Sequence, residues 1–395
     1  MPDDQQIKRW LAEGVITPQQ AEKMMADALA SRKERTSDRL IVVVSTIGAL
    51  LLGIGAVLFV AANWEGLSEL MKTLVLSGST FGVSYLGYVL AYERKNFPKV
   101  GSALLFLGAL LFGATLFLLA QMYHVEANSH LLILLWLIAI LPLVYVLGSL
   151  PIAGLASVLW FMWIGLAIFR QIRVMSPSDV FALPILYLLS GILLFEGGGI
   201  HYLSEALRGV ARVYRVAALK VVMAALFLLT FRFFSGHYDG WNPRAEGAFS
   251  AAMVAGVSVA AVLAILLVVF NLCFNPSKSS TWKLEGGLSL GVLGLTLLLF
   301  FFPSTTNVYT LLFNLVLVGC IAALIGIGYQ REDMRVVNIG MSYFALFVLV
   351  RYCDWFWKLL PRSIFFMVGG TILVLVGIAF EQKRRQLAAQ FAKPR

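Results

Sequence analysis

The amino-acid sequence predicts an all-α, polytopic integral membrane protein with about twelve transmembrane helices. Hydrophobic residues make up 60% of the chain and charged residues only 13%, whereas soluble domains are roughly 45–50% apolar and about 25% charged. The apolar residues fall in blocks of roughly 17–25, the length of helix that crosses a hydrocarbon core of about 30 Å. The lysines and arginines gather in the short segments between these blocks, which is the placement that orients a membrane protein.

The first 39 residues are hydrophilic and predict a small cytoplasmic helical hairpin. Trp10 and Leu11 share one face of an amphipathic stretch. Thr17 and Pro18 then supply an N-cap and a first-turn proline for a second helix. We expect this hairpin, residues 1–39, to pack on the membrane domain or to dock a protein partner. No cleavable signal peptide is expected before the first span.

Twelve apolar blocks follow, and together they predict a membrane domain over residues 40–380 with a basic cytoplasmic tail over residues 381–395. Their approximate limits are residues 40–62, 73–92, 100–121, 131–147, 151–169, 180–196, 216–234, 249–270, 286–302, 309–328, 336–351 and 363–380. Pro142, Pro151 and Pro184 interrupt the fourth to sixth blocks. A re-entrant pair in place of full crossings therefore stays open in that region.

The distribution of basic residues predicts that both termini are cytoplasmic. With the N-terminus inside, 22 lysines and arginines fall in the inner segments and 8 in the outer ones, which is the bias expected of short loops. The net charge of +10 therefore reflects topology and does not indicate nucleic-acid binding. The longest inner loop, residues 197–215, carries three arginines and is interpreted as an amphipathic surface helix.

The sequence offers little support for enzymatic or metal chemistry. It contains no Walker P-loop, no HExxH and no GxSxG motif. The four histidines are spread over loops and the three cysteines lie far apart without CxxC spacing, so no metal site and no cofactor is expected. No residue is assigned a catalytic role.

The predicted topology puts polar segments at the outer ends of the first, third and eleventh spans. These candidate binding residues are Asn63, Trp64, Glu65, Gln121, Tyr123, His124, Glu126, Arg351 and Asp354. Such side chains are costly when turned to lipid, so we expect them to face inward or one another. A cluster of them would bind a polar headgroup, a sugar or an ion, and His124 would titrate near neutral pH. The alternative is that they only anchor the spans at the membrane surface.

Polar residues on the inner side receive a plainer interpretation. Glu196 and His201 end the sixth span and are interpreted as an interface feature in preference to a proton relay. Asn271 and Asn314, at or within spans, are expected to make interhelical hydrogen bonds, which contribute only about 0.6–2 kcal/mol each.

Three segments are specific enough to indicate a family. They are AANWE (61–65), AQMYHVE (120–126) and LAEGVITPQQAEKM (11–24). Together they resemble the DUF2157 family of predicted bacterial membrane proteins, over about residues 5–150. The stretch RYCDWFWKLLPRSIFFMVGG (351–370) also looks like the closing segment of that family. The resemblance implies a multi-pass protein of the bacterial inner membrane and leaves its activity open.

Three functions remain in competition. The first, which we favour, is a transporter-like or lipid-handling protein with a polar pocket at the outer ends of spans 1, 3 and 11. The second is a non-catalytic scaffold or sensor that docks a partner through residues 1–39. The third is an outer-face enzyme acting on a lipid-linked substrate, with Glu65 as its base. Membrane lipids are the expected partners, nucleic acid is not expected, and the oligomeric state stays open.

Overall fold

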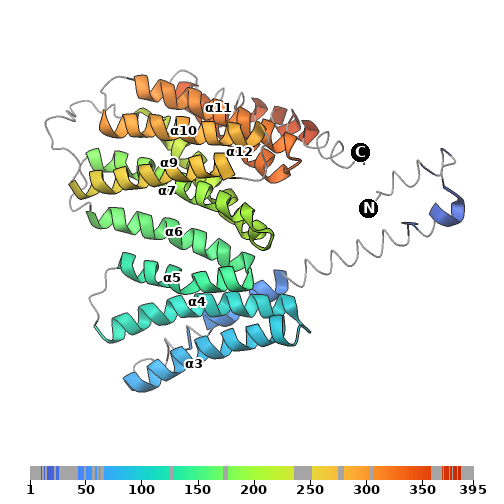
Figure 1. Ribbon diagram of the computed structural model, residues 1–395, viewed down its shortest axis with the longest axis vertical. Helices are drawn as coiled ribbons and strands as arrows, with labels where there is room; N and C mark the ends of the chain where they lie inside the picture. Colours follow the sequence, from blue (N-terminus) through green and yellow to red (C-terminus); the bar gives the residue numbers. More distant parts are fainter. Residues whose placement is uncertain are drawn as a thin grey trace. The chain divides into compact units, whose positions relative to one another are not determined.

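The computed structural model describes the continuous stretches 66–124, 129–171, 177–234, 251–274, 280–302 and 307–356, with shorter pieces between residues 10 and 62 and between residues 367 and 383. These residues form helices and their connections and include no strand, as predicted for an all-α fold (Figure 1). The chain divides into two compact units, Met1–Asn128 and Ser129–Arg395, and each is described by itself.

The first unit is built on an antiparallel pair of helices. Helix α3 spans Glu69–Tyr88 and begins after Ser68, whose hydroxyl accepts a hydrogen bond from the Met71 amide 3.3 Å away. This is the usual way of satisfying a free amide at a helix start. The helix continues into a π-helical turn, η1, over Val89–Glu93. Helix α4 then spans Pro98–Met122.

Small residues bring α3 and α4 into close contact. A Cβ added at Gly101 would lie 2.5 Å from the Ala91 nitrogen and 2.7 Å from the Gly87 carbonyl oxygen. Only a glycine fits at that point, and close backbone approach of this kind is how helices associate where water does not drive them together. Further along the pair, the hydroxyls of Thr80 and Thr115 share a buried hydrogen bond of 2.9 Å.

The second unit is a helical bundle centred on α7 and α8. In the described residues its helices are α5 (Ser129–Leu147), α6 (Leu150–Gln171), α7 (Pro177–Ile200), α8 (Arg208–Leu229), α9 (Ala251–Phe274), α10 (Ser280–Phe301), α11 (Val308–Gln330) and α12 (Met334–Phe356). Helix α7 contacts α6, α8, α9 and α10, and α8 contacts α6, α7, α11 and α12. The apolar core lies where these helices meet and includes Leu188, Leu226, Leu293 and Phe313.

The structure supports nine of the twelve predicted spans. Among the described residues, nine helices are long and apolar enough to cross a membrane: α3 with η1, α4 to α7, and α9 to α12. The first and twelfth predicted spans, 40–62 and 363–380, are described only in part, with an apolar helix over Val43–Gly55 in the first. The seventh, 216–234, corresponds to α8, which is a helix of a different composition.

Helix α8 carries its charges at one end. Arg208, Arg212, Arg215 and Lys220 all lie in its first four turns, so most of the loop predicted over residues 197–215 is in fact helical. Cationic side chains facing lipid are costly. Because α8 is surrounded by α6, α7, α11 and α12, it reaches the bundle interior without exposing Arg215, which is 7% exposed.

The prolines of the middle spans do not interrupt them. Pro142 lies inside α5 and Pro184 inside α7, while Pro151 occupies the first turn of α6. All three helices remain long and apolar enough to cross a membrane. The structure therefore favours full crossings over the re-entrant alternative.

The predicted N-terminal hairpin is described only in short pieces, of which the longest, residues 16–21, covers the start of its second predicted helix. The Thr17 hydroxyl accepts a hydrogen bond from the Gln20 amide at 3.3 Å, and the Gln20 side chain accepts one from the Thr17 amide at 2.9 Å. This reciprocal pair is a capping box, and it agrees with the predicted N-cap. The hairpin as a whole, residues 1–39, and the tail, residues 381–395, lie largely outside the described residues.

Candidate functional site

One group of polar residues in the second unit converges at one end of the bundle. We call it the charged end and define it as the end at which α7, α9 and α11 finish and α8, α10 and α12 begin. Hydrogen bonds join α7 to α9 and α10, and ion pairs join α8 and α11 to α10. The alternating directions of consecutive helices bring these widely separated segments together.

One carboxylate at the charged end is shared by two arginines. The Glu285 Oε2 atom lies 2.7 Å from Nη2 of Arg215, and Oε1 lies 2.7 Å from Nη1 of Arg331. A further bond of 3.0 Å from Arg331 Nη2 to Oε2 makes that contact bidentate. The side chains of Arg215, Glu285 and Arg331 are 8%, 13% and 27% exposed. Paired charges of this burial are held far more tightly than surface ion pairs. We refer to these three residues as the arginine–glutamate cluster.

Aromatic rings enclose the cationic part of the cluster. The Arg215 guanidinium carbon lies 4.1 Å from the ring centroid of Phe195 and 4.4 Å from that of Trp282. The corresponding distance from Arg331 to Trp282 is 5.0 Å. A guanidinium over an aromatic face gains cation–π stabilisation, of about 2 kcal/mol or more when desolvated. The ion pairs and the ring contacts together therefore hold both guanidinium groups in a defined orientation.

A tight turn places Arg331 at the edge of the bundle. It is the C-cap of α11, and Glu332 follows with a φ of 55°. The Asp333 amide donates to the Gly328 carbonyl at 2.9 Å and the Glu332 amide to the Tyr329 carbonyl at 3.2 Å. This is the Schellman arrangement that closes a helix. Because the chain turns at once into α12, the guanidinium of Arg331 projects toward the start of α10.

A second carboxylate at the charged end is held by neutral groups. Glu196 is 4% exposed. Its Oε2 accepts a hydrogen bond from Asn271 Nδ2 and its Oε1 accepts one from Ser289 Oγ, both at 2.7 Å. A Cβ on Gly199 would lie 2.5 Å from that same Asn271 nitrogen, so the glycine makes room for the amide. Asn271 therefore makes the interhelical bond predicted for it, and Glu196 is more deeply built into the bundle than an interface feature.

His201 lies at the same end of the bundle, but its hydrogen bonds are made with groups other than the Glu196 carboxylate. Its Nδ1 lies 2.9 Å from the Gly197 carbonyl oxygen and its Nε2 lies 3.1 Å from the hydroxyl of Tyr145 on α5. Its ring stacks on that of Tyr145 with centroids 5.5 Å apart. These contacts attach the end of α7 to α5.

A cavity of about 280 Å³ opens beside the arginine–glutamate cluster. Arg212, Arg215, Glu285, Arg331 and Asp333 supply its charged part. Its remaining walls are mainly apolar and come from α7, α8, α10, α11 and the start of α12. They include Ile192, Val222, Met223, Leu226, Leu288, Val292, Cys320 and Leu324. The volume is close to the lower end of the range of roughly 300–1,000 Å³ that is usual for ligand pockets.

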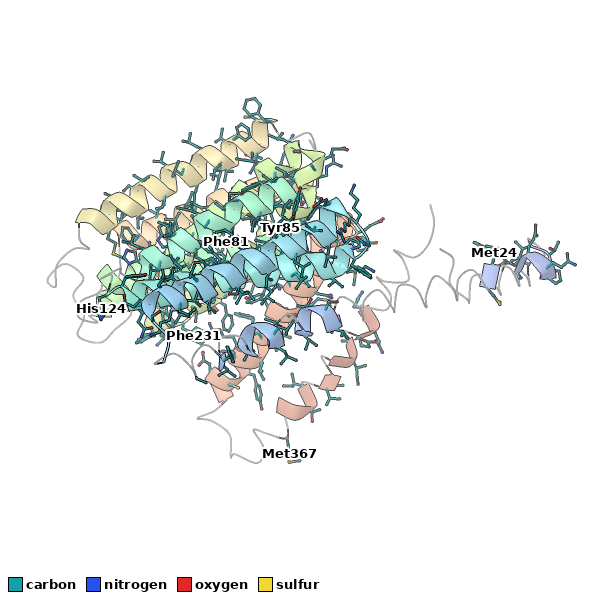
Figure 2. The ribbon with its side chains drawn as sticks, turned by 90° about the horizontal axis from the view of Figure 1, so that it is seen from below. Met24, Phe81, Tyr85, His124, Phe231 and Met367 are labelled. Carbon is teal, nitrogen blue, oxygen red and sulfur yellow. The ribbon has the colours of Figure 1, made fainter. Side chains whose placement is uncertain are left out.

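The predicted site residues of the first unit lie at the end of α4. Gln121, Tyr123 and His124 are exposed, and Figure 2 labels His124 where the helix stops. His124 has a φ of 50°, the left-handed conformation that ends many helices. The Tyr123 hydroxyl lies 3.1 Å from that of Thr73, so this tyrosine joins α4 to α3.

The predicted site residues of the second unit lie at the opposite end from the arginine–glutamate cluster. Arg351 Nη1 lies 2.7 Å from Asp354 Oδ2. Its Nη2 donates to both the carbonyl and the hydroxyl oxygen of Thr230, at 2.9 and 2.6 Å. Thr230 is the C-cap of α8, where a cation is favourable because the helix dipole is negative. Asn314 donates to the same carbonyl at 3.1 Å. Arg351 therefore turns inward, as predicted, and joins α12 to the end of α8.

The predicted outer pocket stays a prediction. Asn63, Trp64, Glu65 and Glu126 lie outside the described residues. Gln121, Tyr123 and His124 belong to the first unit, and Arg351 and Asp354 to the second. In the described stretches, no group of three or more His, Cys, Asp or Glu side chains is arranged to hold a metal ion.

Sequence reasoning missed the arginine–glutamate cluster because its members were assigned to three separate loops. Arg215, Glu285 and Arg331 each stand at the boundary between a polar segment and an apolar block. Two features of the sequence could have indicated the cluster. All three residues lie on the inner side of the predicted topology, and the glutamate is opposite in charge to the two arginines. Trp282, three residues before Glu285, adds an aromatic side chain at the same boundary.

The comparison with family models agrees with the resemblance seen in the sequence. Residues 8–153 match DUF2157, described as a predicted membrane protein. The matched residues include all of α3 and α4 and continue to the beginning of α6. The match ends before the arginine–glutamate cluster, and the likeness proposed for residues 351–370 stays a prediction. No curated protein and no solved structure matches the chain.

Proposed function

We propose that this membrane protein binds a single-tailed amphiphile in the cavity of the second unit, as a transporter-like or lipid-handling protein. The observation that supports this is the combination of a charged rim and apolar walls in one cavity. A molecule with a polar head and a hydrocarbon tail is the occupant that satisfies both parts.

The apolar part of the cavity is long enough to accept a tail. Its lining follows α8 from Arg215 to Leu226, roughly 16 Å of helix at about 1.5 Å per residue. Each methylene group removed from water contributes about 0.8 kcal/mol. A tail in this position would also lie close to Cys320, which is 7% exposed and belongs to the apolar core.

The site would face the cytoplasm in a bacterial inner membrane. The excess of lysine and arginine in the predicted inner segments, 22 against 8, supports this orientation for the charged end. The cytoplasmic leaflet is also the surface that carries negative potential from its lipids. The pocket at the outer span ends and the docking of a partner through residues 1–39 remain separate proposals.

Photolabelling with a neutral probe tests the proposal. The full chain, purified in an uncharged detergent, is irradiated with dodecanol that carries a diazirine at its tail end, and the labelled peptides are mapped by mass spectrometry. We expect labels on cavity residues such as Met223, Val292 and Leu324. Cys320→Phe should reduce this labelling about tenfold, a loss of about 1.4 kcal/mol, because the ring fills the cavity. Val318→Phe is the matched control, since Val318 is on the same helix and 45% exposed.

The opposite result has a clear meaning. Labels confined to exposed faces of the helices and unaffected by Cys320→Phe would contradict amphiphile binding in the cavity. The scaffold function would then take its place, and deletion of residues 1–30 would be the next change to make.

A further inference from the structure

The cavity carries more positive than negative charge. Arg212, Arg215 and Arg331 face it, together with Glu285 and Asp333. One carboxylate oxygen of Asp333 accepts a hydrogen bond of 3.0 Å in the first turn of α12. That oxygen is therefore occupied in capping the start of the helix. Glu285 is left as the acceptor for two guanidinium groups. A surplus of guanidinium donors favours an anionic occupant.

Two of the arginines have donor capacity to spare. The Nε atom of Arg215 is buried and has no acceptor among the described residues, although its side chain is only 8% exposed. A buried donor without an acceptor costs about 1–3 kcal/mol. Arg212 is exposed at the rim and forms no ion pair within the described part of the chain. Arg212, which lines the cavity, is placed to donate to an anionic group that reaches the rim.

Glu285 has the chemistry of the group that such a site would bind. Its Oε2 atom accepts from both Arg215 and Arg331, and its Oε1 atom accepts from Arg331, which is therefore bound in bidentate fashion. Planar carboxylates and tetrahedral phosphates are the anions that guanidinium groups recognise by paired hydrogen bonds. Arg215 is buried and Arg331 is partly buried, and both need such a partner, because a buried cation without one is strongly destabilising.

We propose that Glu285 is an internal competitor for an anionic head group, so that a carboxylate- or phosphate-headed amphiphile binds Arg215 and Arg331 in place of Glu285. This inference rests on the proposed function, since it concerns the head of the molecule whose tail occupies the apolar part. It adds the chemical class of the ligand and a mechanism of exchange: release of the ligand lets Glu285 return to the arginines, which therefore never lose an anionic partner.

Competition against the neutral photoprobe measures the head-group preference. Laurate, dodecyl phosphate and dodecanol share a twelve-carbon tail and differ in the head. With the wild-type chain at mildly alkaline pH, we expect both anions to suppress labelling at concentrations about tenfold lower than dodecanol does. The comparison of laurate with dodecyl phosphate distinguishes a fatty acid from a phospholipid-type head.

Two substitutions test the role of Glu285. Glu285→Gln keeps the shape and removes the charge, so the two anions should compete about tenfold better than with wild type, whereas dodecanol should be unchanged. Glu205→Gln is the matched control, because the Glu205 side chain is 86% exposed and pairs only with Arg208 at the surface. Arg212→Gln, at the exposed rim, should weaken competition by both anions and leave dodecanol unaffected.

The outcomes separate the inference from the function on which it rests. If the neutral probe does not label the cavity, amphiphile binding itself is contradicted. If the probe labels it but the anions compete no better than dodecanol, or Glu285→Gln weakens the anions, the internal-competitor role is wrong and amphiphile binding stands. Should Glu285→Gln fail to fold, the wild-type preference and the Arg212→Gln result decide, and an absence of both would overturn the inference.

Discussion

Gly199 shows how a missing side chain supports a buried polar group. Glu196 receives its hydrogen bonds from Asn271 and Ser289, on two other helices, and these bonds require the Asn271 amide to lie against α7. At Gly199 a Cβ would collide with that amide. Two residues earlier, Gly197 has nothing within 4 Å of the corresponding position. Two glycines in one helical turn therefore have different roles.

Alanine substitutions at these two glycines should have opposite effects. Gly199→Ala pushes the Asn271 amide away from Glu196, and a buried acceptor that loses a partner costs about 1–3 kcal/mol. Gly197→Ala meets no obstacle and gains helix propensity of about 1 kcal/mol. We expect the thermal midpoint in detergent to fall for the first variant and to rise for the second. A similar rise for both would mean that the hydrogen bond from the Asn271 side chain to Glu196 contributes little to stability.

The residue scale is also where the sequence was least informative. It indicated correctly that Arg351 turns inward, because a charged side chain at a span end must find a partner. It did not indicate that Thr230, far away in the chain, is that partner. Likewise, Glu285 is separated by tens of residues from both arginines. Hydropathy shows where a helix begins and ends but not which helices are neighbours.

At the scale of helices, α3 and α4 depend on a glycine at their closest approach. Gly101 faces the backbone of Ala91 and Gly87 with no space for a side chain. Gly82, on α3, has nothing within 4 Å of an added Cβ. The pairing of these two helices is therefore set by the first position and is insensitive to the second.

Leucine substitutions should separate these two positions. Gly101→Leu forces α3 and α4 apart, and overpacking of this kind typically costs about 1–3 kcal/mol. Gly82→Leu should leave the pair intact, since the added side chain enters open space. Limited proteolysis of the purified chain is the measurement, because separation of the helices loosens the exposed connection at residues 94–97 and so speeds cleavage there. Equal protection of both variants would contradict the packing described for Gly101.

Most helices were predictable from their apolar length, and the exceptions have a physical reason. The apolar blocks 100–121, 249–270 and 309–328 predict spans, and the structure contains them as α4, α9 and α11. Pro142 and Pro184 weakened the prediction for α5 and α7, although a proline inside a span is tolerated where neighbouring groups compensate for its lost hydrogen bond. Helix α8 was placed too late in the chain because its first turns are cationic. Of these cations, Arg215 is shielded by other helices, and composition alone carries no information about shielding.

At the scale of the second unit, the alternation of helix direction sorts the polar residues into two groups. Arg215, Glu285 and Arg331 lie at the charged end, and Thr230 and Arg351 lie at the other. In both groups the arginines have acceptors, and the charged end also has the cavity lined by Arg212, Arg215 and Arg331. The orientation of the bundle in the membrane therefore decides from which side the cavity receives its occupant.

The distribution of basic residues predicts that the charged end faces the cytoplasm. A cysteine-free chain provides the background for single cysteines at Ser204 and at Asn307, which are both exposed and lie beyond opposite ends of the bundle helices. In intact bacterial cells that express the protein, a membrane-impermeant maleimide should label Asn307→Cys directly. It should label Ser204→Cys only after the cells are opened. The reverse pattern would mean that the cavity opens toward the outer face. Anionic lipids of the cytoplasmic leaflet would then no longer be the expected source of its occupant. Labelling of both positions in intact cells would contradict an arrangement in which α7 and α11 both span the membrane.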